Sequence, residues 1–297
     1  MANLKEVRNR IASVQSTQQI TKAMKMVSAA KLKRATNAII ALRPYATKLK
    51  EILGNLSASL EGSSSPFIQE REPNKVLIVT VSSNRGLAGA FNMNVIKAAN
   101  NLIADKYSEQ LKNGNVSIIS IGKKTQDYYE KRKYNVIGNN NEIFSALTFE
   151  NVTKITDAIM AGFVKGEFDK VEVVYNRFRN AAVQFITTEQ LLPLPKAEPV
   201  ADTKSDKRTT NIDYILEPSQ EEIVEQLIPK SIKIQLYKAV LDSHASEHGA
   251  RMTSMDKATE NAGELLKALK LSYNQARQAA ITTELTEIVS GAAALEG

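Results

Sequence analysis

The two histidines of the chain, His244 and His248, lie four residues apart in the segment HASEH. This segment matches the pattern H-x-x-E-H of one class of zinc proteases, in which two histidines of one helix bind zinc and Glu247 would act as the base. His248 also falls on the apolar side of a helical pattern, where a metal ion would have no open cleft beside it. Short patterns match by chance, so we favour a structural role and keep a zinc hydrolase as the alternative.

A second chemical candidate is the segment SSNRGLAGAFN, residues 82–92. It follows an apolar run typical of a buried strand, and α/β proteins bind phosphate groups at such turns. Gly86 and Gly89 would let the backbone approach an anion, but neither G-x-G-x-x-G nor G-x-x-x-x-G-K-[ST] is present. We therefore expect a tight turn, with no nucleotide, cofactor or metal bound there.

The elements around this turn predict an α/β domain over residues 74–195. Apolar runs typical of strands begin at residues 75, 115, 134, 170 and 182, and segments with helical spacing lie between most of them. Such alternation predicts an open, mostly parallel, Rossmann-like sheet with helices on its faces. A polar loop is expected over residues 196–217.

Long helices are predicted at both ends, over residues 1–61 and 219–297. Apolar residues repeat there at steps of three and four, which is typical of a coiled coil. Because both helices belong to one chain and flank one domain, we expect them to pair antiparallel with a left-handed supercoil. Pro44 should leave the first helix unbroken, and Pro229 should bend or restart the second.

The first helix changes character in its middle. The repeating positions form a seam, the row of side chains that would face the other helix. The apolar residues in the middle of the first helix, Ile20, Met24 and Val27, lie on a different face from this seam. One interpretation is that the helix changes neighbours within the chain, and the other is that this stretch faces a second protein. The seam positions of this stretch are polar: Gln18, Thr21, Lys25 and Ser28.

Positive charge is concentrated near the N-terminus. Residues 1–50 hold eleven lysines and arginines and one acid, Glu6, in a chain with a formal net charge of +7. Solvated helices normally mix both signs, so this stretch indicates an acidic partner. An acidic protein is one candidate, and nucleic acid is the alternative, although interleaved aromatic residues and a groove-reading motif are missing.

The C-terminal residues show the opposite pattern, since no lysine or arginine follows Arg277 while apolar residues continue. No run reaches the roughly 18 apolar residues that a membrane crossing needs. The chain has no cysteine, which excludes disulfides and thiolate sites, and its first residues do not read as a secretory signal. We expect a protein that faces the cytoplasm.

Three segments together resemble the gamma subunit of F-type ATP synthases. They are VRNRIASVQSTQQITKAMKMVSAAKLKRA, SSNRGLAGAFN and RQAAITTELTEIVSGAAAL. The resemblance covers nearly the whole chain apart from residues 196–211. Relatives commonly have cysteine in the glycine-rich turn where this chain has Ala88, and the insertion bearing a regulatory dithiol in chloroplasts is absent.

The resemblance implies a rotor shaft without a catalytic site of its own. Such a shaft turns inside a ring of alpha and beta subunits, and its base is fixed to the epsilon subunit and the membrane c-ring. Proton flow then drives ATP synthesis, at the cytoplasmic face of the bacterial inner membrane, with the shaft as a peripheral subunit and no nucleic acid as partner.

The resemblance also implies contact residues for the catalytic ring. Met24 and Lys25 would lie near acidic lever loops of the beta subunits. The C-terminal tip would turn in an apolar collar. The further contact residues implied are Arg251, Arg277, Gln278, Thr282, Ile288 and Leu295.

Overall fold

The computed structural model describes residues 4–55, 65–195 and 220–296. They belong to two compact units, one made of Met1–Ala29 with Arg251–Gly297 and the other of Ala30–Ala250. We call them the terminal unit and the central unit. The helices α1 (Leu4–Asn55) and α7 (Gln220–Glu296) contribute residues to both. The polar loop predicted over residues 196–217 lies outside the described residues.

The central unit contains a five-stranded sheet in the order β3-β2-β1-β4-β5. Parallel pairs join β1 to β2, β1 to β4 and β2 to β3, whereas β5 runs antiparallel to β4. The mostly parallel sheet that the apolar runs predicted is therefore confirmed. The strands are β1 (Val76–Val81), β2 (Val116–Ile121), β3 (Asn135–Val136), β4 (Lys170–Phe178) and β5 (Gln184–Leu192).

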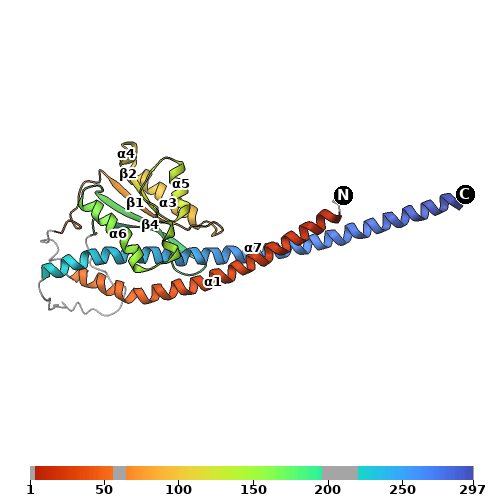
Figure 1. Ribbon diagram of the computed structural model, residues 1–297, viewed down its shortest axis with the longest axis horizontal. Coiled ribbons are helices and arrows are strands. Elements are labelled where there is room, and N and C mark those ends of the chain that lie inside the picture. The colour runs from red at the N-terminus through yellow and green to blue at the C-terminus, as the bar shows by residue number, and fades with distance from the viewer. Residues whose placement is uncertain (1–3, 56–64, 196–219, 297) are drawn as a thin grey trace. The chain divides into compact units, whose positions relative to one another are not determined.

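Helices cover both faces of the sheet, so β1 is buried along its whole length. On one face, α3 (Phe91–Lys106) and α5 (Lys123–Lys131) pack on alternate residues such as Val76 and Ile78. On the other face, α6 (Phe149–Val164) and the central-unit part of α7 share an apolar cluster with Leu77 and Val79, and Leu49 and Leu53 of α1 belong to the same cluster. Figure 1 shows this layering around the sheet.

The terminal helices pair antiparallel within each unit. In the central unit, Ala35 and Ile39 share an apolar cluster with Ala245 and Leu241, so numbering rises along α1 as it falls along α7. In the terminal unit, Arg8 contacts Tyr273 and Lys25 contacts Asp256 in the same sense. The expected architecture of paired terminal helices and an α/β domain is confirmed, and the handedness of the supercoil stays a prediction.

Pro44 and Pro229 both lie inside continuous helices. Helix α1 runs through Pro44 as expected, and α7 runs through Pro229 without restarting. Pro229 removes one backbone donor, but Ile228 and Ile232 beside it are fully buried in the core of the central unit. Packing of this kind supplies most helix stability in proteins, so it offsets one lost hydrogen bond.

Two short elements were not predicted, namely α4 (Ser108–Lys112) and the 3₁₀ helix η1 (Asn141–Ser145). Both have five residues, too few to show a helical period in the sequence. Among the described residues, no helix combines the length and the apolar content that a membrane crossing requires.

Candidate partner-binding surface of the paired helices

The side of α1 that faces α7 in the terminal unit keeps one register along its length. Val7 is 8% exposed, and the polar seam residues Thr21 and Ser28 are 8% and 2% exposed. These positions lie seven or fourteen residues apart, as a heptad seam requires. The helix therefore keeps its neighbour through the polar stretch, and only the chemistry of the seam changes.

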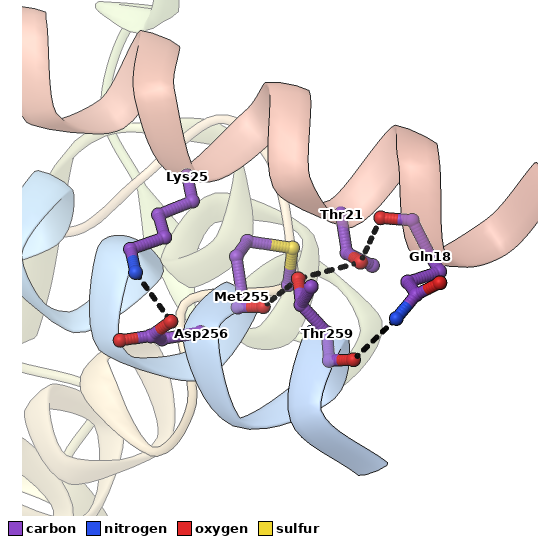
Figure 2. A network of polar contacts seen from close by, with 6 residues as sticks. All are labelled: Gln18, Thr21, Lys25, Met255, Asp256 and Thr259. Carbon is purple, nitrogen blue, oxygen red and sulfur yellow. Dashed lines mark hydrogen bonds and ion pairs between the residues drawn. The ribbon is translucent and has the colours of Figure 1, made fainter. Parts of the chain in front are cut away.

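Hydrogen bonds satisfy this polar seam. The Thr21 hydroxyl lies 3.0 Å from the Gln18 carbonyl, to which it donates, and 2.8 Å from the Thr259 hydroxyl. Thr259 can donate its single proton to Thr21 or to the Met255 carbonyl at 2.7 Å. The Gln18 amide donates to the Thr259 carbonyl at 3.5 Å. Figure 2 shows these side chains converging between the two helices.

An ion pair continues the network one turn further along α1. The Lys25 ammonium lies 2.5 Å from a carboxylate oxygen of Asp256, and the two side chains are 40% and 45% exposed (Figure 2). An ammonium has three N–H donors, so Lys25 can bind a second acid while it holds Asp256. The internal acid was missed in the sequence, because Asp256 lies 231 residues away.

Large apolar side chains lie on the outer side of the same stretch of α1. Ile20, Met26 and Val27 are 60%, 61% and 57% exposed, whereas Met24 is half-buried. Ile20 and Val27 are seven residues apart and therefore share one face of the helix. Exposed apolar side chains grouped in this way mark protein-binding surfaces. They favour the interpretation in which this stretch faces a second protein.

The last part of α7 extends beyond its pairing with α1. Helix α1 begins at Leu4, and near this end Arg8 donates a hydrogen bond to the Tyr273 hydroxyl of α7 at 2.8 Å. Every residue from 281 to 292 is exposed. Ile288 and Val289 are each 66% exposed, and together with the exposed Ile281 and Leu285 they form an apolar stripe along one side of the helix.

Helix α7 contacts the end of β1, directly before the glycine-rich turn. Strands β1 and β4 are neighbours at the point where the strand order reverses, which is where doubly wound proteins bind nucleotides. Here the Ser243 hydroxyl donates to the Val81 carbonyl at 3.3 Å, and the Ser246 hydroxyl donates to the Asn176 carbonyl at 3.0 Å. Helix α7 thus lies against β1 and β4 beside the usual ligand position.

Side chains of the turn itself bond to one another. The Ser83 amide donates to the Asn92 side-chain oxygen at 2.9 Å, and the Ser83 hydroxyl donates to the Arg85 carbonyl at 2.6 Å. Leu87 and Gly89 have positive φ angles of 63° and 57°, as a tight reversal requires. The turn is built as the sequence predicted.

Comparison with known proteins identifies the family. A family model described as ATP synthase matches residues 3–295. The ATP synthase gamma chain of Flavobacterium psychrophilum is 58% identical over 298 residues and covers all of both chains. That of Cytophaga hutchinsonii is 55% identical over 296 residues, 99% of each chain. The chain belongs to the ATP synthase gamma chain family.

Solved structures of distant members share the fold. The rotor of the Euglena gracilis mitochondrial ATP synthase matches with a TM-score of 0.63 at 22% identity, over 94% of this chain and 98% of that one. The central stalk of the Tetrahymena thermophila mitochondrial ATP synthase matches with a TM-score of 0.56 at 22% identity, over 80% of this chain and 99% of that one.

The contact residues expected of a gamma chain have different environments. Arg277, Gln278 and Thr282 are exposed, and the Thr282 hydroxyl donates to the Gln278 carbonyl at 2.9 Å. Arg251 is only 8% exposed, so it differs from the other expected contact residues. The side chain of Leu295 lies outside the described residues. Contact of any of these residues with a catalytic ring stays a prediction.

Proposed function

We propose that this gamma chain is the central rotor shaft of an F-type ATP synthase, coupling proton flow to ATP synthesis by rotation. The observation that carries the proposal is the unpaired end of α7, where residues 281–292 are all exposed and no lysine or arginine occurs. The exposed apolar stripe of this segment, which contains Ile281, Leu285 and Ile288, is typical of a surface that a partner protein covers. A collar without charges would let it turn, because no buried ion pair has to break at each step.

The shaft acts without a catalytic site of its own. Ser243 of α7 donates to the Val81 carbonyl at the end of β1, beside the position where other doubly wound proteins bind nucleotides. The chemistry of ATP then belongs to the alpha and beta subunits, and this chain acts through its shape. Two paired helices lack three-fold symmetry, so each rotation angle presents different contacts to three surrounding sites and shifts their nucleotide affinities.

The remaining partners follow from the same proposal. The α/β domain would bind the epsilon subunit and the membrane c-ring, which places the chain at the cytoplasmic face of a bacterial inner membrane as a peripheral subunit. The exposed Lys22, and Lys25 through its remaining donors, would meet acidic loops of the beta subunits.

The deciding experiment is a rotation assay. The chain is assembled with its alpha and beta subunits, the ring is fixed to a surface, and a bead is attached to an exposed residue of the α/β domain such as Lys112. Unidirectional rotation of the bead on addition of ATP is expected. An assembled complex that hydrolyses ATP while the bead stays still would refute the shaft. Tight DNA binding that weakens steeply with salt would instead support the nucleic-acid alternative.

A further inference from the structure

The histidine pair on α7 is a feature that the shaft role does not use. The Nε2 atoms of His244 and His248 lie 3.1 Å apart, and the two rings meet edge to face with centroids 4.5 Å apart. They are the only histidines of the chain. We propose that this pair is a two-imidazole binding site for a late first-row divalent metal ion, with Cu²⁺ preferred and Zn²⁺ also bound.

The separation of the two nitrogens fits a shared ion. Imidazole nitrogen binds zinc at about 2.0–2.1 Å, so two nitrogens on one ion lie roughly 2.9–3.4 Å apart for angles between square and tetrahedral. The observed 3.1 Å falls inside this interval. Residues four apart on a helix face the same side, which is why both rings can reach one point.

Packing already holds the two rings in place. The His244 ring stacks on Phe144 of η1, with centroids 5.7 Å apart and planes 12° from parallel. His248 is 4% exposed, and a methyl group added to the next residue, Gly249, would lie 3.1 Å from the Ala181 carbonyl. The turn between β4 and β5 therefore lies close to α7 here. Ligands fixed before binding lose little entropy when the ion arrives.

The donor set determines which ion is preferred. Imidazole suits copper, zinc and nickel, and among divalent ions copper binds most tightly to a given nitrogen site. Within the described residues, no group of three or more metal-binding side chains of the His, Cys, Asp and Glu types comes together. Water would complete the coordination, so the ion would exchange rather than be held permanently.

One proton has to move for the ion to bind. The contact between the two Nε2 atoms needs one ring to donate and the other to accept. The donating ring must shift to the tautomer with its hydrogen on Nδ1, after which both Nε2 lone pairs face the ion. A neutral pair therefore releases no proton, whereas a singly protonated pair releases one, and acid should weaken binding.

The test uses the full-length chain without a histidine tag. Calorimetric titration with Cu²⁺ and Zn²⁺ should show one site, tighter for Cu²⁺. The electron paramagnetic resonance spectrum of the copper form should show coupling to two nitrogens. His244→Gln should weaken copper binding roughly tenfold or more, since even outer-shell changes cost that much. His248→Gln should do the same, and the double variant should lack the site.

A matched control separates the site from the number of histidines. His244→Gln combined with Lys257→His keeps two histidines but moves one to an exposed position elsewhere on α7. It should bind copper no better than His244→Gln alone, with unchanged circular dichroism. The proposal is overturned if the double Gln variant binds copper as tightly as the natural chain, or if the copper spectrum shows fewer than two nitrogens. Because His244 is half-buried, His244→Gln decides the matter even if His248→Gln fails to fold.

Discussion

Lys25 can meet two acidic groups, Asp256 of its own chain and the acidic loop of the proposed partner. The internal pair is about half exposed, and exposed pairs contribute roughly 0.2–1 kcal/mol. Asp256→Asn should therefore lower the free energy of unfolding by less than about 1 kcal/mol in urea denaturation. The exchanged pair, Lys25→Asp with Asp256→Lys, should recover that loss.

The exchanged pair also tests the partner contact. It restores attraction within the chain but places a negative charge where the partner loop is negative, so ATP-driven proton pumping by the reconstituted complex should stay weakened. Normal pumping by the exchanged pair would show that Lys25 acts only through Asp256.

The carboxyl group of Asp242 carries an acid–base prediction. Burial raises its pKa to about 6 from 3.8, although Lys238 and Arg43 nearby act in the opposite direction. Between these pH values the folded chain holds a proton that the unfolded chain has released, so stability falls as pH rises through this window. At about 1.36 kcal/mol per pKa unit, the full penalty is at most about 3 kcal/mol.

Asp242→Asn removes this penalty and should stabilise the chain at pH 8 far more than near pH 4. Urea denaturation at the two pH values measures the difference. Asp105→Asn, at an exposed position, is the control for the same chemical change. An Asp242→Asn variant that is equally destabilised at both pH values would show that its contacts with the neighbouring cations outweigh its burial.

At the scale of elements, the polar side chains in the seam between α1 and α7 satisfy one another by hydrogen bonds, so the seam does not weaken the pairing. Thr21→Val removes the hydrogen bond between the two hydroxyls, while Thr259 can still donate to the Met255 carbonyl, so it should cost about 0.5–1.5 kcal/mol. Thr21→Val with Thr259→Val removes both hydroxyls and should recover most of that loss, because both partners become apolar. Urea denaturation of the two single variants and the double variant gives the coupling energy. Purely additive losses would mean that the 2.8 Å contact contributes nothing.

The elements also show what a sequence can reveal. The strands were predictable because continuous apolar runs such as that of β1 have one physical explanation, burial on both faces. The partners of Gln18 and Thr21 were not predictable, because the sequence does not show which side chain faces which across the seam and the partners lie more than 200 residues away. The contacts of Ser243 and Ser246 with the sheet were equally hidden, since serine on a helix usually faces water.

At the scale of the whole molecule, deletions at the exposed end of α7 can separate a role in assembly of the complex from a role in coupling. Deletion of residues 288–297 removes apolar contacts that every rotation angle would share, and such contacts cannot favour one angle over another. The deletion should therefore lower the yield of assembled complex and leave coupling largely intact. Deletion from Gln278 onward should also reduce coupling, because the polar groups of Gln278 and Thr282 are lost.

A charged variant provides the matching control. Ala293→Lys with Ala294→Lys would place two cations inside the proposed collar and should impair assembly more than the short deletion does. Complex yield and ATP-driven proton pumping are measured for all three variants. Loss of coupling in fully assembled complexes of the short deletion would show that the end of α7 does more than turn freely.

Helix α7 contacts strands β1 and β4 as a bound peptide would, so the sheet and α7 of the central unit resemble a receptor and its ligand joined in one chain. The serine hydroxyls of α7 reach the Val81 and Asn176 carbonyls, as a bound ligand would, and covalent continuity keeps that peptide at a high effective concentration. A fragment of the chain that ends before α7 should accordingly bind a separate synthetic peptide of residues 228–250. Such fragment complementation would turn a rotary subunit into a two-component reporter, whose signal depends on binding of the α7 peptide to the sheet.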